Sequence, residues 1–99
     1  MAMTTDDPRA AVRALAFEYV EVLRGRITDR DLSVVLSSAN CGEEYHSVMA
    51  AVAAAKVYEF ALPDELNNRA LELFRGREAD LEELRERLAE SPAARGAHA

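Results

Sequence analysis

The chain has 99 residues, of which 49% are hydrophobic and 30% are charged, and its formal net charge at pH 7 is -6. This length suffices for one domain with one modest hydrophobic core. The acidic balance excludes a general nucleic-acid-binding surface, which needs an excess of Lys and Arg, and it excludes attraction to an anionic membrane. The single cysteine, Cys41, excludes an internal disulfide framework.

Composition and the ends of the chain predict a cytoplasmic helical protein. The N-terminal residues lack a basic start followed by an apolar run, and no segment is long and apolar enough to span a bilayer. An alanine-rich chain with 4 Gly and 3 Pro favours helix. We expect residues 1–7 to be a flexible N-terminus, residues 8–90 to be a single helical domain, and residues 91–99 to be a disordered tail.

The first helix is predicted to begin at Asp7-Pro8, with the aspartate as N-cap and proline at the first helical position. Apolar residues follow at helical spacing up to Leu23, and Gly25 indicates the end of the helix. Phe17 falls on the polar side of this helix. It indicates either a contact with another subunit or a lone exposed aromatic side chain.

Two further helices are predicted before Pro63. Thr28, with Asp31 three residues later, resembles a capping box and predicts a short second helix. A second capping box, Asn40 with Glu43, predicts a third helix over about residues 41–60. Five alanines between positions 50 and 55 make this helix apolar on nearly all sides. Such a helix is usually central, so we expect it to be the most buried one.

After Pro63 the chain is predicted to form one long amphipathic helix up to Glu90. Its apolar stripe keeps a three-four spacing across Gly76 and contains Leu66, Ala70, Leu73, Arg77, Leu81, Leu84 and Leu88. Such a helix approaches a length of about 40 Å, at about 1.5 Å per residue. The predicted fold is therefore all-α, a compact bundle of about four helices with a long C-terminal amphipathic helix. No internal repeat is expected.

The far end of this long helix predicts self-association. A small domain would leave Leu81, Leu84 and Leu88 uncovered, so we expect a homodimer contact there. The alternative is that the helix bends at Gly76 and folds back on the same chain. Arg77, within the stripe, is either a side chain whose stem covers apolar surface or a partner for a carboxylate such as Glu18.

One short motif suggests a metal site. Glu43 and His46 lie three residues apart, which resembles the Glu-x-x-His motif of the ferritin-like di-iron carboxylate proteins. The resemblance implies iron or manganese, with Glu18 and Glu21 as further ligands and a dimer supplying a second motif. The alternative is an exposed helix start, where acidic residues interact favourably with the helix dipole.

Residues 32–52 can also be laid over a helix-turn-helix, with Gly42 in the turn, so a transcriptional regulator of the helix-turn-helix type is a further alternative. The recognition helix would then carry no Arg or Lys before Lys56. DNA-reading helices need cations for the phosphates and donors for the bases, so the sequence argues against direct nucleic-acid binding.

The functional expectation is a small acidic module for protein–protein interaction: a regulator, adaptor or accessory subunit that also binds itself. The candidate interface residues are Phe17, Arg77, Leu81, Leu84 and Leu88. An acidic surface favours a basic partner. No Gly-rich phosphate loop or zinc-ligand cluster appears, so the sequence leans away from an enzyme and implies no cofactor outside the metal alternative.

Overall fold

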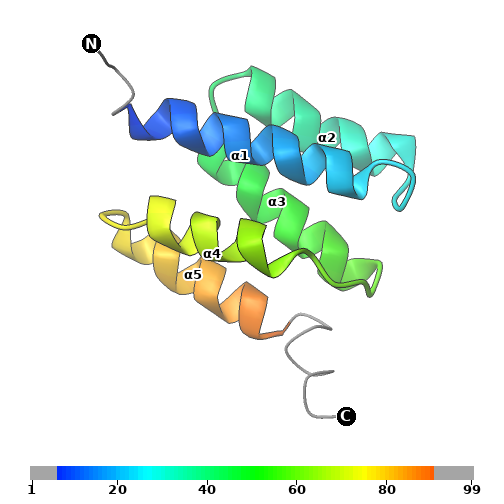
Figure 1. Cartoon of the computed structure of the whole chain (residues 1–99). Coiled ribbons are helices and arrows are strands. Elements are labelled where there is room, and N and C mark those ends of the chain that lie inside the picture. The colour runs from blue at the N-terminus through cyan, green and yellow to red at the C-terminus, as the bar shows by residue number, and fades with distance from the viewer. Residues whose placement is uncertain (1–6, 91–99) are drawn as a thin grey trace.

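The computed structural model describes residues 7–90, and these form five α-helices and no strand (Figure 1). The helices are α1 (Pro8–Leu23), α2 (Asp29–Asn40), α3 (Glu44–Val57), α4 (Asp64–Leu73) and α5 (Glu78–Ala89). The all-α prediction is confirmed, but the number of about four helices is one too low for this part of the chain. Apart from Asp7, the predicted flexible N-terminus and disordered tail lie outside the described residues.

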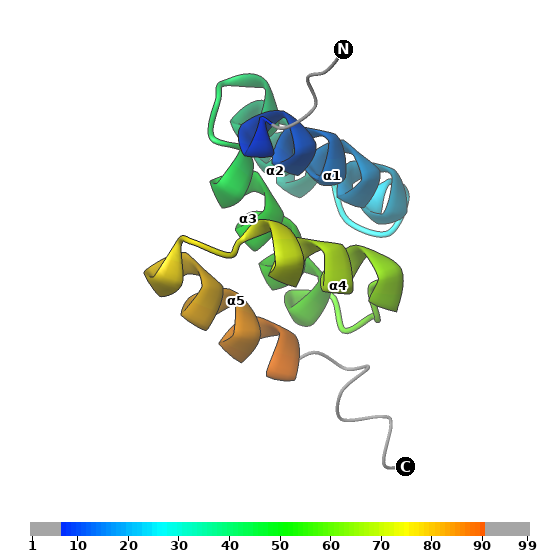
Figure 2. The same ribbon diagram turned by 60° about the vertical axis from the view of Figure 1, so that its left-hand side comes forward.

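The chain is arranged as two helical hairpins with α3 between them. α1 and α2 form the first hairpin, α4 and α5 form the second, and Figures 1 and 2 show them on opposite sides of α3. α4 also packs against α1. None of the helices in residues 7–90 is long and apolar enough to cross a membrane.

The starts of the first two helices follow the predicted caps. Asp7 accepts a hydrogen bond from the backbone N–H of Arg9 at 3.0 Å, and Pro8 occupies the first helical position. The hydroxyl of Thr28 accepts one from the backbone N–H of Asp31 at 3.2 Å. Both N-caps are confirmed, because each side chain satisfies one of the free amides of a first helical turn. The return bond of the predicted Thr28–Asp31 capping box is absent, because the backbone N–H of Thr28 donates to the hydroxyl of Tyr58 instead.

The start of α3 differs from the prediction. α2 continues through Asn40, and the side chain of Glu43 makes no capping hydrogen bond. Gly42 instead adopts the left-handed conformation (φ 81°), and the backbone N–H of Glu43 donates to the carbonyl of Ser38 at 2.9 Å. This geometry is that of a Schellman motif, which ends α2 rather than starting α3. The predicted Asn40–Glu43 capping box is therefore wrong.

The predicted long C-terminal helix is also wrong, because the chain turns at Gly76. α4 ends at Leu73, Gly76 has a φ of 94°, and α5 begins at Glu78. A positive φ is accessible to glycine at little cost and ends a helix. α5 then folds back onto α3 and α4, where Leu84 is fully buried. The alternative, a bend at Gly76 that folds the second half back on the same chain, is confirmed.

The two hairpins turn at nearly the same sequence, which corrects the expectation of no internal repeat. Residues 20–26 read Val-Glu-Val-Leu-Arg-Gly-Arg, and residues 71–77 read Leu-Glu-Leu-Phe-Arg-Gly-Arg. The glycine has a positive φ in both, 83° at Gly25 and 94° at Gly76. In both turns the arginine after the glycine lies over an aromatic ring. The Cζ atom of Arg26 is 5.1 Å from the ring centre of Phe60, and that of Arg77 is 3.9 Å from the ring centre of Tyr45.

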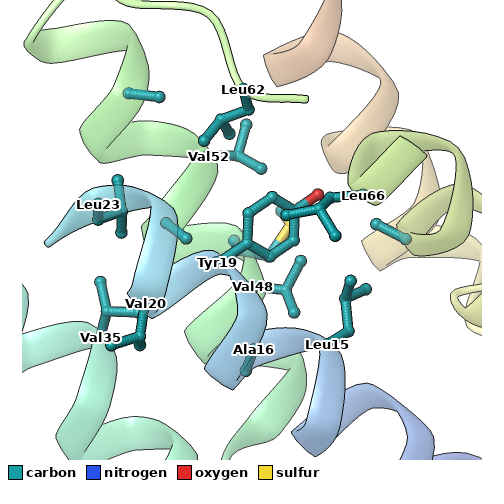
Figure 3. Close-up of a cluster of buried hydrophobic side chains, with 14 of the residues drawn as sticks. Leu15, Ala16, Tyr19, Val20, Leu23, Val35, Val48, Val52, Leu62 and Leu66 are labelled. Atoms are coloured by element: carbon teal, nitrogen blue, oxygen red, sulfur yellow. The ribbon is translucent and has the colours of Figure 1, made fainter. Parts of the chain in front are cut away.

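The core forms mainly where α1 and α2 pack on α3. Figure 3 shows Tyr19 in its midst, with side chains from α1, α2, α3 and α4 around it. Val48, Met49 and Val52 are buried, as expected for the central helix. The hydroxyl of Tyr19 donates to Asn67 Oδ1 at 2.9 Å, and burial raises the pKa of this phenol.

Candidate interaction surface

The carboxylate of Glu18 is bound by an arginine other than the predicted one. Arg69 of α4 donates to both its oxygens, at 3.0 and 2.6 Å, and these hydrogen bonds lower the pKa of Glu18. Arg77 pairs with Asp80 at 2.9 Å and lies against Tyr45 of α3. Of the two alternatives for Arg77, the pair with Glu18 is wrong, because the turn at Gly76 carries Arg77 to α3 and leaves Arg69 facing α1.

The four candidate metal ligands do not come together within the chain. Glu18 is bound by Arg69, and Glu21 pairs with Arg24 at 3.0 Å. Glu43 and His46 are exposed near the start of α3. Among residues 7–90, no group of three or more His, Cys, Asp or Glu side chains could hold a metal ion. A site shared between two copies stays a prediction that no contact in this structure favours.

The neighbouring acid, Glu44, has a role that the sequence analysis missed. Its side chain is 5% exposed and accepts a hydrogen bond from Arg9 Nε at 2.6 Å, and this bond raises the pKa of the guanidinium. Arg9 also donates to the carbonyl of Gly42 at 2.9 Å. The contact joins the starts of α1 and α3. Helical spacing from Glu44 to the buried Val48 was the signal that could have found it.

The residues predicted to bind another subunit differ in exposure: Arg77 is exposed, and the other four are partly or fully covered by the chain itself. Leu84 is fully buried, and Leu81 and Leu88 are half-buried against the core. Phe17 is also half-buried, with the Arg13 guanidinium 5.8 Å from its ring centre. The prediction of Leu84 as an interface residue is therefore wrong, because α5 folds back and buries this side chain.

The large apolar side chains left exposed are on another surface. Among the described residues only Val34 of α2 (53% exposed) and Val57 of α3 (75%) belong to this class. Both line one groove between α2 and α3, with a volume of about 240 Å³. The groove is lined by Asp31, Val34, Val35, Ala50, Ala53, Ala54, Val57 and Tyr58. We call it the α2–α3 groove.

A second groove follows the other side of α3, where α5 packs. It consists of two hollows of about 310 and 410 Å³, both bordered by Glu83 and Arg87. The larger hollow shares Ala53 and Val57 with the α2–α3 groove, and the smaller one shares Ala50. We call this the α3–α5 groove. The two grooves thus flank one strip of α3, which we call its outer face: His46, Ala50, Ala53 and Val57.

The outer face lacks the chemistry of a DNA-reading helix. α2 and α3 are packed helices joined by the turn at Gly42. The cation that borders the outer face on α3 is Lys56, and it is paired at 2.5 Å with Glu90, the C-cap residue of α5. Phosphate contacts need several available cations. The geometry therefore favours an apolar partner over a duplex on this surface.

The described residues give no sign of an enclosed catalytic site. Every buried side-chain nitrogen or oxygen within residues 7–90 has a hydrogen-bond partner. Cys41 is exposed in the turn after α2. The chain matches no model of a known protein family, and no curated protein or solved structure is significantly similar to it. The functional proposal therefore depends on the surface of the chain itself.

Proposed function

We propose that this protein is a protein–protein interaction module, a regulator, adaptor or accessory subunit, whose binding surface is the outer face of α3 with the grooves beside it. The proposed occupant is an amphipathic helix of another protein. The observation that carries the proposal is the position of Val34 and Val57, the exposed large apolar side chains of residues 7–90, on the two walls of one groove.

The shape of this surface suits a helix. Grooves bounded by helices accept the apolar face of another helix, which binds through side chains spaced three and four residues apart. Ala50 and Ala53 form a low ridge because their side chains end at Cβ. The backbone of a partner can therefore approach this ridge closely. Covering the exposed parts of Val34 and Val57 would contribute on the order of 1 kcal/mol each.

Charge favours another protein over a second copy of this chain as the occupant. Each copy carries a formal net charge of -6, so two copies repel each other. Self-association through the partly exposed Leu81 and Leu88 stays a separate prediction, to which the buried Leu84 cannot contribute. Any dimer would have to offset the charge repulsion with apolar contact.

Site-specific photo-crosslinking in the native host tests the proposal. A photoreactive amino acid replaces Val57 in one variant and Ala79 in the control; Ala79 is exposed on α5 and borders neither groove. We expect the Val57 position to crosslink to one segment of a partner, identified by mass spectrometry and helical in that partner. The Ala79 position should give no such product.

The companion variant is the double substitution Val34→Glu, Val57→Glu. Both valines are exposed on helices, so glutamate fits the fold, and an unchanged circular dichroism melt checks this. Binding of the crosslinked partner should be lost, whereas Ala79→Glu should retain it. Equal crosslinking from both positions, a product joining two copies of this chain, or full binding by the double variant would each contradict the proposal.

A further inference from the structure

We infer that the partner helix is cationic along one flank, and that this flank lies against the α5 edge of the surface. The inference rests on the proposed function and specifies the chemistry of its occupant. The α5 edge is formed by Glu83, Glu86 and Glu90, which line the hollow of about 410 Å³ in the α3–α5 groove. These positions are three and four residues apart, so they share one side of α5.

The cations near this edge are already engaged. Arg87 binds Glu83 of the same helix at 2.6 Å, and Lys56 of α3 binds Glu90 at 2.5 Å. Glu86 forms no ion pair with any residue of the described part of the chain. Within residues 7–90, the carboxylates of this edge therefore outnumber the cations that bind them, and Glu86 at its middle has no cation bound to it.

The negative charge continues around the C-terminal end of α3. Asp31 lies on the α2–α3 groove, and it accepts a hydrogen bond from the hydroxyl of Tyr58. The C-terminal end of α3, at Val57, adds the partial negative charge of the helix dipole. Val57 thus has carboxylates on both grooves beside it. An occupant that covers Val57 with an apolar face meets this charge on its flanks, and lysine or arginine there complements it.

The opposite charge pattern on the partner is disfavoured by the same geometry. A glutamate-flanked helix would bring like charges against Glu86 and Asp31, while the lysine and arginines of residues 7–90 that line the grooves are already paired with carboxylates. Such juxtaposition selects against a partner more strongly than matching charges add affinity. The apolar strip accounts for binding, and the α5 edge accounts for the choice among apolar helices.

Three synthetic helices test the inference on the intact protein. Each has the length of α3, 14 residues, and is stapled on its solvent face because isolated short helices are marginal in water. All three carry the same alanine–leucine face, with flanks of lysine, glutamine or glutamate. We expect the lysine peptide to bind at least about tenfold more tightly than the glutamate peptide, with the difference shrinking at high salt.

Matched charge reversals locate the effect. Glu86→Lys should weaken binding of the lysine peptide about fivefold, whereas Glu82→Lys, on the same helix but bordering neither groove, should leave it nearly unchanged. Equal affinity for all three peptides, abolished by Val34→Glu with Val57→Glu, would overturn the inference and keep the proposed function. Two results would overturn both the inference and the proposed function. One is that the double valine variant binds the peptides as tightly as the unchanged protein does, and the other is that no peptide binds.

Discussion

Two buried polar side chains are each hydrogen-bonded to a side chain from a helix distant in the sequence. Glu44 is bound by Arg9, which connects α3 to the first turn of α1, and Tyr19 is bound by Asn67, which connects α1 to α4. A buried polar group without a partner costs on the order of 1–3 kcal/mol, so each pair favours one packing arrangement of the helices over others. Sequence spacing alone does not identify such pairs, because the partners are 35 and 48 residues apart.

Tyr19 makes the stability of the fold depend on pH in the alkaline range. Burial raises its pKa above the unfolded value of about 10, so the folded state holds the phenol proton more tightly than the unfolded state does. The resulting contribution is fully present below about pH 10 and decreases as the pH rises further. We expect the urea midpoint to fall above that pH.

The control for this prediction is Tyr19→Phe. It removes the hydrogen bond to Asn67 and should cost about 1 kcal/mol at neutral pH. Its urea midpoint should then decline less steeply with alkaline pH than that of the unchanged protein. Parallel declines in the two proteins would show that other groups cause the alkaline loss of stability.

The ends of the helices show which element boundaries a sequence can reveal. Asp7 and Thr28 are recognisable as N-caps because their side chains bond to backbone within the next three residues. α3 ends at Val57, three residues before the predicted end. Glu59 adopts the left-handed conformation there (φ 59°), a position where glycine would have been the usual signal.

Gly76 and Gly25 lie in nearly the same local sequence, but only Gly25 is predicted to end a helix. The leucine stripe stays in phase across Gly76, and this favoured a continuous helix. The phase of the stripe does not distinguish one straight helix from two helices that fold back on each other and bury the same leucines within the chain. Comparing residues 20–26 with residues 71–77 would have predicted the second hairpin, since the first was already expected to end at its glycine.

α5 is attached to the rest of the fold mainly through Leu84, its buried residue. Replacing Leu84 with Ala should cost about 2–5 kcal/mol, because the substitution leaves a cavity beneath the helix. Leu88 is only half-buried, so Leu88→Ala, the matched control, should cost clearly less. Urea denaturation measures both costs. A loss for Leu84→Ala no larger than that for Leu88→Ala would contradict the fold-back of α5.

At the scale of the whole molecule, the sequence predicted an acidic all-helical protein with a central third helix, and the structure has that fold. It did not predict where the uncovered surface lies. α3 is apolar on nearly all sides, so its alanines carry no periodic signal that separates a buried side from an exposed one. That separation arises only when α2 and α5 pack beside α3 and leave its outer face between them.

The outer face of α3 is the proposed binding surface for a helix from another protein. Methyl NMR spectra of the protein, recorded with and without the lysine-flanked peptide, test whether the peptide binds there. We predict that the methyl signals of Val34 and Val57 shift on binding, while those of Leu81 and Leu88 on α5 stay in place. Shifts confined to Leu81 and Leu88, with both valines unmoved, would contradict the claim and return the interface to the leucines of α5.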